Sequence, residues 1–455
     1  MSAFDANELA DDTFIDGSGP RDPRRVLIQP PAPQLSTIRP GAWPNNALRQ
    51  LGSCRRVLML QGPIGPFFRD LGRLLQRKGM EVHKINFTGG DCRYHPSGQW
   101  FRGSPTEFSA MLRDTILRTR PDACIVFGQD RPVHQVARQV LKAMGIPLMV
   151  FEEGYVRPNF VTLEMDGVNA RSSFVWSPFA PDRASDGASG PNELPAAPLF
   201  QLPFRQVASL AAQYHALSRV MSPLAPAYRH HRPMAIGPEA LAWLKAGWIK
   251  TWAPVHARGL MRRLARPDAP PYFLVPLQVH NDSQLQHHSR YDSIAEFIQE
   301  VLASFLAHAP QESHLVIKHH PMDRGHRNYR SLIRRLLKDL GDPGAASRVH
   351  YVLDGHLPTM LTHARGTVVI NSTVGLSSMH HGTPVIALGQ ALYQHPGLTH
   401  MGPLDTFWCA PTPPSPQQFQ HLLSALIGQT QLPGTFYWPS RGYGGLLAAI
   451  EAALD

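Results

Sequence analysis

The stretch VLMLQGPIGPFFRDLGRLLQRKGMEVHKINF, residues 57–87, decides the fold class of this chain. It opens with a short apolar run, which predicts a buried strand, and a turn rich in glycine and proline follows at 62–66. Over 67–77 the apolar side chains recur on one face of a helix, which ends at Gly79, and a second strand is expected over 81–87. Strand, glycine-rich turn, helix and strand predict a βαβ unit at the head of a parallel sheet.

The same alternation continues and then starts again after an interruption. Strands are expected at 123–128, 146–151, 272–279, 314–318, 349–353, 367–370 and 384–388, and helices at 107–118, 133–144, 293–307, 328–340 and 374–381. Between the two series, 177–204 is a Pro-, Ala-, Ser- and Asp-rich loop, and 205–265 is helical in character but broken by prolines. The sequence therefore predicts an α/β, GT-B-like architecture, with two Rossmann-like domains facing a cleft, as in many sugar-nucleotide glycosyltransferases.

These patterns also predict the domain boundaries. We expect a flexible, Pro-rich leader over 1–50, an N-terminal Rossmann-like domain over 51–265 with a basic helical insertion at about 201–270, a C-terminal Rossmann-like domain over 270–430, and a last helix over 431–455 that packs back on the N-terminal domain. No repeat of 20–50 residues is present, which argues against solenoids and propellers.

Composition excludes several classes of protein. The 455 residues are 43% hydrophobic and only 17% charged, which excludes a wholly disordered chain, a coiled coil and a collagen-like fibre. Four scattered cysteines favour a reducing compartment. The N-terminus is acidic and polar, unlike a secretory signal, and no apolar run reaches the length of a membrane span. We expect a cytoplasmic protein, which can still lie on a membrane surface.

Ligands of open α/β sheets bind at the carboxyl ends of the strands, so the residues just past each strand are candidates. After the first strand, the glycines of Gly62-Pro63-Ile64-Gly65 would let a backbone approach a ligand, and amides at the following helix start could bind an anion. The turn matches neither GxGxxG nor a P-loop, and a tight turn without a ligand is an equal alternative.

Two strand ends carry carboxylates. Glu152 and Glu153 follow a strand directly, and paired carboxylates suit general acid/base chemistry, although a solvated loop is the simpler reading. Asp282 follows the first strand of the second series in the segment VPLQVHNDSQ and could act as nucleophile or base on a sugar carbon. The alternative is that Asn281 and Asp282 only make a turn.

Two further strand ends could hold a phosphate. Lys318 and the two histidines of Lys318-His319-His320-Pro321 could neutralise it, and Ser372 and Thr373 of Asn371-Ser372-Thr373-Val374-Gly375 could bind it at a helix N-terminus. The alternatives are an ordinary strand end and plain N-capping. None of the 23 histidines forms HExxH and no cysteine pair lies near them, so we expect no metal.

Taken together, these residues resemble the bacterial capsule polysaccharide synthesis family, the KpsS/KpsC-type β-Kdo transferases. The likeness runs from about Val57 to about Gly397. It is carried by LQGPIGPFF at 60–68, VHKINFTGGD at 82–91, FEEGY at 151–155, VPLQVHNDSQL at 275–285, KHHP at 318–321 and NSTVGLSSMHHGTPVIALG at 371–389.

The resemblance implies a GT-B-fold enzyme that uses CMP-Kdo, with similarity to the CMP-sugar sialyltransferases. In that group an acidic motif lies at the reacting centre, matched by Glu152-Glu153-Gly154, and an HP motif and a Ser/Thr motif bind the CMP phosphate, matched by His320-Pro321 and Ser372-Thr373. It implies no cofactor or metal, because CMP is a monophosphate leaving group. The donor-binding set it implies is Gln278, Lys318, His320, Pro321, Asn371, Ser372, Thr373 and Gly375.

The resemblance also implies roles and an acceptor. Asp282 is the expected nucleophile of a retaining transfer, and Glu152 or Glu153 activates the acceptor hydroxyl, a choice the sequence leaves open. One copy of each motif is typical of the single-module type, which begins a poly-Kdo linker on a phosphatidylglycerol-type lipid. Residues expected to line the acceptor side or cleft are Gly62, Pro63, Gly65 and Asp91. Cys92 and Arg93 depart from the family pattern and leave room for a different acceptor.

The net charge of +10 is concentrated in one segment. Residues 201–270 hold ten Lys and Arg against two acids, a local charge of +8, together with Trp243, Trp248 and Trp252. Basic residues beside interfacial aromatics, here Arg262 and Arg263 among others, predict docking on an anionic leaflet, so the protein would be peripheral on the inner membrane. The alternative is an interdomain helix pair with tryptophans in its core.

Rival functions have less support in the sequence. A nucleic-acid-binding protein would fit the basic charge, but no RRM, zinc-finger or helix-turn-helix signature is present. A non-catalytic capsule export scaffold is a second rival, and a CMP- or UDP-sugar transferase with another sugar or acceptor is a third. Other capsule synthesis or export proteins are expected partners.

Overall fold

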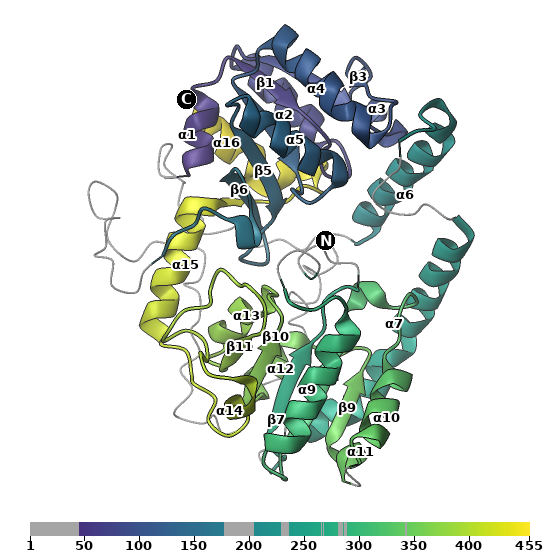
Figure 1. Ribbon diagram of the computed structural model, residues 1–455, viewed down its shortest axis with the longest axis vertical. Coiled ribbons are helices and arrows are strands. Elements are labelled where there is room, and N and C mark those ends of the chain that lie inside the picture. Colours follow the sequence, from purple (N-terminus) through teal and green to yellow (C-terminus); the bar gives the residue numbers. More distant parts are fainter. Residues whose placement is uncertain are drawn as a thin grey trace. The chain divides into compact units, whose positions relative to one another are not determined.

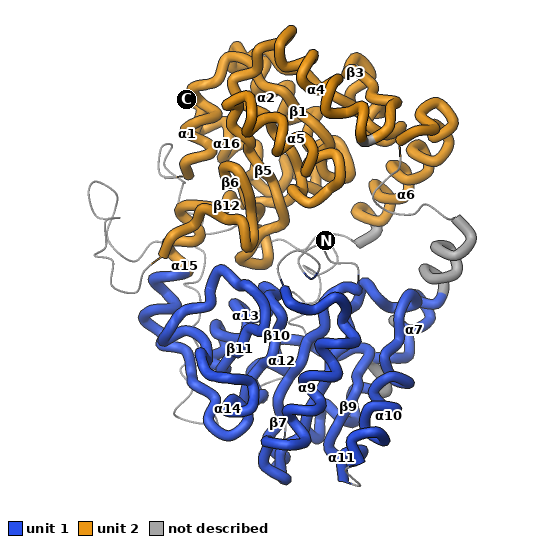
Figure 2. The backbone as a smooth tube through the Cα atoms, in the orientation of Figure 1, with its two compact units in different colours: residues 1, 3–30, 235–422 blue, residues 2, 31–234, 423–455 orange. Residues whose placement is uncertain are grey.

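The computed structural model describes residues 45–176, 204–228, 236–264, 266, 268–280, 285, 289–341 and 344–455. The chain divides into two compact units (Figure 2). Among the described residues, unit 1 contains 236–422, and unit 2 contains 45–228 together with 423–455.

Unit 2 is built on a seven-stranded sheet of order β12-β6-β5-β4-β1-β2-β3 (Figure 1). The strands are β1 (Arg56–Met59), β2 (Glu81–Asn86), β3 (Gln99–Trp100), β4 (Ala123–Phe127), β5 (Leu148–Glu153), β6 (Phe160–Met165) and β12 (Gln431–Pro433). The first five are parallel, in the order of a Rossmann-like sheet, and β6 and β12 extend the sheet in antiparallel fashion.

Helices bury both faces of this sheet. One face packs its apolar side chains against α4 (Pro105–Thr119) and α5 (Pro132–Ala143). On α2 (Phe67–Arg77), Phe67 makes edge-on contacts with Phe151 and Phe436, so residues of the C-terminal segment share its core. The remaining helices of the unit are α1 (Asn46–Gly52), α3 (Gly89–Tyr94), α6 (Phe204–Val220) and α16 (Leu446–Leu454), with α15 (Pro416–Thr430) leading back into it.

Unit 1 has a five-stranded, wholly parallel sheet of order β11-β10-β7-β8-β9. Its strands are β7 (Tyr272–Pro276), β8 (His314–Lys318), β9 (Val349–Val352), β10 (Gly366–Val369) and β11 (Val385–Ala387). One core cluster joins the sheet to α9 (Ile294–His308) and α10 (Arg330–Asp339), and a second joins it to α7 (Ile236–Leu264) and α12 (Leu357–His363). The short helices are α11 (Ala345–Arg348), α13 (Val374–His380) and α14 (Leu404–Phe407). Two Rossmann-like α/β sheets confirm the predicted fold class.

The observed division differs from the predicted boundaries in the basic segment. The sequence placed 201–270 in one insertion of the N-terminal domain, but α7 belongs to unit 1 and only α6 belongs to unit 2. The reason is packing: Leu260, Met261 and Leu264 of α7 lie against the core beside β7 and β9. The predicted last helix is also divided, into β12, the 3₁₀ helix η6 (Pro439–Gly445) and α16. Within the described residues, no helix is both long and apolar enough to cross a membrane.

Candidate functional site

The acidic pair of unit 2 lies at the carboxyl end of β5. Glu152 and Glu153 are its last two residues, and both are partly exposed. The main-chain N–H of Glu153 donates to Oε1 of Glu152 at 3.1 Å. The next residue, Gly154, has no room for a side chain, because the chain passes close to β6 there. A Cβ on Gly154 would lie 2.2 Å from the carbonyl oxygen of Phe160. The glycine of this motif therefore has a packing reason that involves no ligand.

Glu152 lies beside the loop that follows β4. A side chain at Gly128 would lie 3.5 Å from Nε of Arg131 and 3.8 Å from Oε2 of Glu152, so these two groups flank the glycine. Burial raises the pKa of Glu152 to about 7; the neighbouring Glu153 adds to the rise, and Arg131 opposes it. A carboxyl group that titrates near neutrality suits proton transfer at physiological pH.

Glu153 has a partner that the sequence did not reveal. The hydroxyl of Tyr437 donates to Oε1 of Glu153 at 2.7 Å, across 284 positions of the chain. Burial, and then Glu153, raise the pKa of Tyr437 well above its ordinary value, so the phenol keeps its proton and remains a donor. The C-terminal segment is fixed at this place by β12, where Gln431 accepts from the main-chain N–H of Tyr155 at 2.9 Å. The two glutamates therefore differ in their surroundings.

The glycine turn after β1 is packed from both sides. A Cβ on Gly62 would lie 2.7 Å from the ring of Phe68, and the carbonyl of Gly62 accepts from Nη1 of Arg131 at 3.0 Å. Pro63 and Gly65 are buried, and Gly65, with φ +108°, lies under Leu210 of α6. These residues have structural reasons, so their predicted place beside the acceptor is still a prediction.

Asp91 serves the fold. Its carboxylate accepts the main-chain N–H groups of Phe87 and Thr88, both at 3.0 Å, and the hydroxyl of Tyr214 on α6 at 2.9 Å. Burial works to raise its pKa, but Lys84 and these donors outweigh that effect, and the pKa lies below its ordinary value. Asp91 therefore anchors α6 to the sheet, and its predicted place on the acceptor side or cleft stays a prediction.

The donor-side residues of unit 1 gather at the carboxyl edge of its sheet. Gln278 follows β7 and Asn371 follows β10, which are neighbouring strands. Nε2 of Gln278 donates to Oδ1 of Asn371 at 3.0 Å, and the Asn371 N–H donates back to Oε1 of Gln278 at 3.3 Å. These two strands are the point where the strand order reverses, the usual place for a ligand in such a sheet.

The segment after β8 contains one outward and one inward histidine. His320 is partly exposed, and its Nδ1 accepts the N–H of Met322 at 3.2 Å within the turn η5 (Pro321–Asp323). A neutral ring held in this way carries its proton on Nε2. His319 is buried against Tyr351, whose hydroxyl lies 2.7 Å from its Nδ1, and burial lowers the pKa of His319 to about 4. His319 is thus a neutral core residue, and Lys318 is also buried.

The Ser/Thr motif lies between β10 and α13. Oγ of Ser372 accepts the N–H of Val374 at 3.2 Å, while Thr373 makes no side-chain cap. A Cβ on Gly375 would lie 2.2 Å from the hydroxyl oxygen of Tyr393, which donates to the Ser372 carbonyl at 2.5 Å. Gly375 therefore makes room for Tyr393, and the Ser372 hydroxyl is bound locally just before α13, whose N-cap residue is Thr373.

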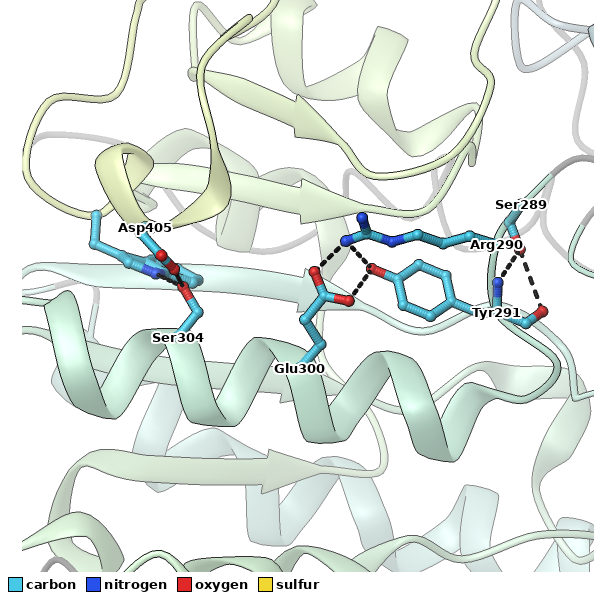
Figure 3. Close-up of polar contacts among 7 residues, drawn as sticks. Ser289, Arg290, Tyr291, Glu300, Ser304 and Asp405 are labelled. Atoms are coloured by element: carbon cyan, nitrogen blue, oxygen red, sulfur yellow. Dashed lines mark hydrogen bonds and ion pairs between the residues drawn. The ribbon is translucent and has the colours of Figure 1, made fainter.

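Asp282, the expected nucleophile, lies outside the described residues, but the residues around it are held. His280 contacts the buried Asp323 of η5 through its ring and its main chain. On the far side, Leu285 is buried in the core of unit 1, and Tyr291 and Arg290 bind Glu300 of α9 (Figure 3). Asp323 was missed by sequence reasoning, although its position just after β8, the neighbour of β7, could have indicated it.

The tryptophans predicted to contact a membrane differ in their exposure to solvent. Trp248 on α7 is 72% exposed, and Arg262 and Arg263 are exposed too. Trp252 is partly buried and lines a cavity of about 380 Å³ between α7, α10 and β9, together with Arg330 and Arg334 among others. The side chain of Trp243 lies outside the described residues. Within the described ranges, no cluster of three or more His, Cys, Asp or Glu side chains is placed to hold a metal ion.

Comparison with known families identifies the chain. A family described as "Capsule polysaccharide biosynthesis protein" matches residues 122–437, which include the acidic, HP and Ser/Thr motifs. The chain belongs to this capsule polysaccharide biosynthesis family. The family resemblance predicted from the motifs is thereby confirmed.

Relatives within the capsule polysaccharide biosynthesis family match most of the chain. The capsule polysaccharide export protein KpsS of Escherichia coli is 39% identical over 86% of this chain and 99% of its own length. The capsule polysaccharide modification protein LipB of Neisseria meningitidis serogroup B is 36% identical over 86% and 94%. Among solved structures, the β-Kdo 2,7-transferase KpsC of Thermosulfurimonas dismutans is similar at a TM-score of 0.36 and 14% identity, covering 81% of this chain and 89% of that one, a likeness too distant to bear on activity.

Proposed function

We propose that this protein is a glycosyltransferase that moves β-Kdo from CMP-Kdo to a phosphatidylglycerol-type lipid and so starts the poly-Kdo linker of a capsular polysaccharide. The observation that carries the proposal is the place of the family motifs: each lies at or just past the carboxyl end of a strand, the acidic pair on β5, the HP turn after β8 and the Ser/Thr pair after β10. Membership in the capsule polysaccharide biosynthesis family and the match to KpsS over 99% of its length support the same assignment.

The proposed transfer has two displacements. Asp282 attacks the anomeric carbon of Kdo, the bond to the CMP phosphate breaks, and CMP leaves as the phosphate takes the electron pair. The acceptor hydroxyl then attacks the same carbon, releases Asp282 as a carboxylate and gives its proton to a general base, so that configuration is retained. We assign that base to Glu152, because its pKa is near 7, while Glu153 is the partner of Tyr437.

The donor is held in unit 1 in this proposal. Nε2–H of His320 and the hydroxyls of Ser372 and Thr373 contact the CMP phosphate, and the hydrogen-bonded pair of Gln278 and Asn371 forms the floor below it. Lys318 and Gly375 support this set from within the fold, and Pro321 follows His320 at the start of η5. No metal or other cofactor takes part, because a monophosphate leaving group needs no divalent ion to neutralise it.

To test the transfer, the protein is incubated with CMP-Kdo and a lyso-phosphatidylglycerol analogue, and the products are identified by mass spectrometry. We expect a mono-Kdo lipid and free CMP, no product from Asp282→Ala, and unchanged product from the control Asp292→Ala, an exposed carboxylate in the same part of the chain. Full activity in Asp282→Ala would overturn the mechanism. Product only with CMP-sialic acid or a UDP-hexose would replace the sugar, and no product from any donor would favour an export scaffold.

We also propose that α7 rests on the anionic inner leaflet. Trp248, Arg258, Arg262 and Arg263 are exposed on this helix, and each basic residue near an anionic surface contributes about 1 kcal/mol of binding. Flotation with liposomes tests this contact. We expect recovery with phosphatidylglycerol-rich vesicles that falls in Arg262→Ala/Arg263→Ala, and equal recovery with neutral vesicles would overturn it.

A further inference from the structure

Asp323 is a buried carboxylate that holds a single histidine at two points. Its side chain is 1% exposed, and its Oδ1 lies 2.6 Å from Nδ1 of His280. Its Oδ2 accepts the main-chain N–H of His280 at 2.9 Å. One carboxylate thus fixes both the ring and the backbone of the same residue. The side chain of His280 itself is 26% exposed.

The topology explains why these two residues meet. β7 and β8 are parallel neighbours, with Pro276 paired to Lys318, so their carboxyl ends reach the same edge of the sheet. His280 follows β7 by four residues, and Asp323 follows β8 by five, in the turn that begins with the HP motif. The pair therefore lies at the edge where His320, Gln278 and Asn371 also lie.

The contact determines which ring nitrogen of His280 can meet a ligand. Nδ1 donates its hydrogen to Oδ1 of Asp323, so Nε2, on the opposite side of the ring, is the nitrogen that faces away from the carboxylate. No hydrogen bond to Nε2 is present among the described residues. A buried carboxylate that orients a partly exposed imidazole is the arrangement by which proteins fix a histidine for contact with a substrate.

His280 is also the last described residue before Asp282 in the chain. His280 is fixed by Asp323, and the described residues beyond the segment that contains Asp282 are fixed as well: Oγ of Ser289 donates to the Leu285 carbonyl at 2.6 Å, and Tyr291 donates to Glu300 of α9 at 3.0 Å (Figure 3). The contacts of Tyr291 fix the residues after this segment to α9, and those of His280 fix the residue before it to the HP turn.

We infer that His280 is a donor-binding residue, positioned by Asp323, whose Nε2–H contacts a phosphoryl oxygen of the CMP moiety. In the complex the ring donates from Nδ1 to Asp323 and from Nε2 to the ligand, so the buried carboxylate and the phosphate lie on opposite sides of one ring. This inference rests on the proposed function, because it takes the nucleotide of the donor as its ligand. It adds a residue to the phosphate contacts and gives Asp323 a positioning role.

Two asparagine substitutions separate this role from a purely structural one. In His280→Asn, the amide nitrogen occupies the place of Nδ1 and still donates to Asp323, while the atom corresponding to Nε2 is gone. In Asp323→Asn, one oxygen becomes an NH₂ group, which cannot accept from both His280 donors. The control is His308→Asn, which removes the histidine from the surface pair His308–Asp405 of the same unit, where the charged atoms lie 3.4 Å apart.

CMP affinity by calorimetry is the first readout, and kcat and KM for CMP-Kdo are the second. A hydrogen bond to a charged group is worth about 1.5–3 kcal/mol, so we expect His280→Asn to weaken CMP binding about 10- to 150-fold with its melting temperature unchanged. Asp323→Asn weakens binding in the same direction, and His308→Asn stays within twofold of the wild type.

Each outcome decides a separate question. Wild-type affinity for CMP in His280→Asn, with a loss only in His280→Ala, would show that the ring is a structural link and would overturn the inference. Failure of the wild-type protein to bind CMP would overturn the proposed function instead, before any variant is compared. If His280→Asn both loses CMP binding and melts at a lower temperature, Asp323→Glu, which keeps the negative charge, decides the question. Wild-type stability with weakened CMP binding in Asp323→Glu would support the positioning role. Wild-type stability with wild-type affinity would overturn it.

Discussion

Glu152 and Glu153 are neighbours in sequence, yet their surroundings give them different chemistry. Burial disfavours the charged form of Glu152 and raises its pKa to about 7, whereas Glu153 accepts a hydrogen bond from Tyr437. A raised carboxyl pKa makes the fold most favourable when the group is protonated. The contribution of Glu152 to stability is therefore present at acidic pH and is lost as the pH rises through about 7.

The raised pKa of Glu152 predicts that its replacement by glutamine increases stability and decreases activity. Glu152→Gln removes the costly charge, so at pH 8 its melting temperature should exceed that of the wild type by about 2 °C, with no difference at pH 5. Its transfer rate should fall at least about 100-fold, because an amide cannot accept the acceptor proton. Scanning fluorimetry at both pH values, beside product formation, checks the pair of effects. Equal melting temperatures of the two proteins at pH 8 would contradict the raised pKa of Glu152. Burial also raises the pKa of Glu164 to about 7, but this residue is present in both proteins and so does not contribute to their difference.

Tyr437→Phe tests the partner of Glu153 by removing a single hydroxyl. We expect kcat to fall about tenfold with KM for CMP-Kdo unchanged, because the phenol orients a carboxylate of unit 2 and does not belong to the donor-side cluster. Steady-state kinetics separate the two constants. A change in KM alone would place Tyr437 on the donor side and contradict this role.

At the scale of elements, α6 is held to the sheet partly through the buried carboxylate of Asp91. Asp91 receives Tyr214 of α6, and Gly90 allows the Tyr214 ring to approach so closely that a Cβ there would lie 2.4 Å from it. Burial lowers the pKa of the neighbouring Lys84 to about 8, with Asp91 opposing the shift. Since the pKa of Asp91 is depressed, its stabilisation is present above about pH 4 and is lost as the pH falls below that value.

Asp91→Asn should therefore destabilise unit 2 strongly. Removal of the Asp91 charge weakens the acceptor of the Phe87 and Thr88 N–H groups and of the Tyr214 hydroxyl. It also takes away the negative charge near the buried Lys84, and together these losses cost about 3–5 kcal/mol at pH 7. The matched control is Asp114→Asn, which breaks the exposed pair with Arg118 and should cost less than about 0.5 kcal/mol. Urea denaturation gives both values, and equal losses would show that Asp91 is no more than a surface contact.

Elements differed in how far the sequence could predict them. β1, β4, β8 and β10 follow short apolar runs and were predicted within a residue or so, because parallel strands buried on both faces are apolar throughout. β6 was missed, although its antiparallel pairing with β5 is local. β12 was missed as well, because it pairs with β6 across about 270 positions, which no local pattern records. The same distance hid Tyr437. The contact of His280 with Asp323 was within reach, since both follow neighbouring strands.

At the scale of the whole molecule, the two units have separate hydrophobic cores. Heating should therefore unfold the chain in two calorimetric transitions, which departs from two-state behaviour. CMP at about 100 times its Kd should stabilise unit 1 by about 2.7 kcal/mol and raise its transition, while the transition of unit 2 stays in place. Scanning calorimetry with and without CMP checks this, and an equal shift of both transitions would contradict a nucleotide site confined to unit 1.

The path of the chain between the units has a consequence for biosynthesis. Among the described residues, a ribosome makes most of unit 2 first, then residues 236–422 of unit 1, and only afterwards β12, Tyr437 and α16, which complete unit 2. Until those residues emerge, the outer edge of β6 is unpaired and Glu153 lacks its tyrosine. A nascent chain interrupted anywhere before residue 431 is therefore left with an incomplete acidic centre, so this protein acquires its proposed activity only when synthesis has passed both units.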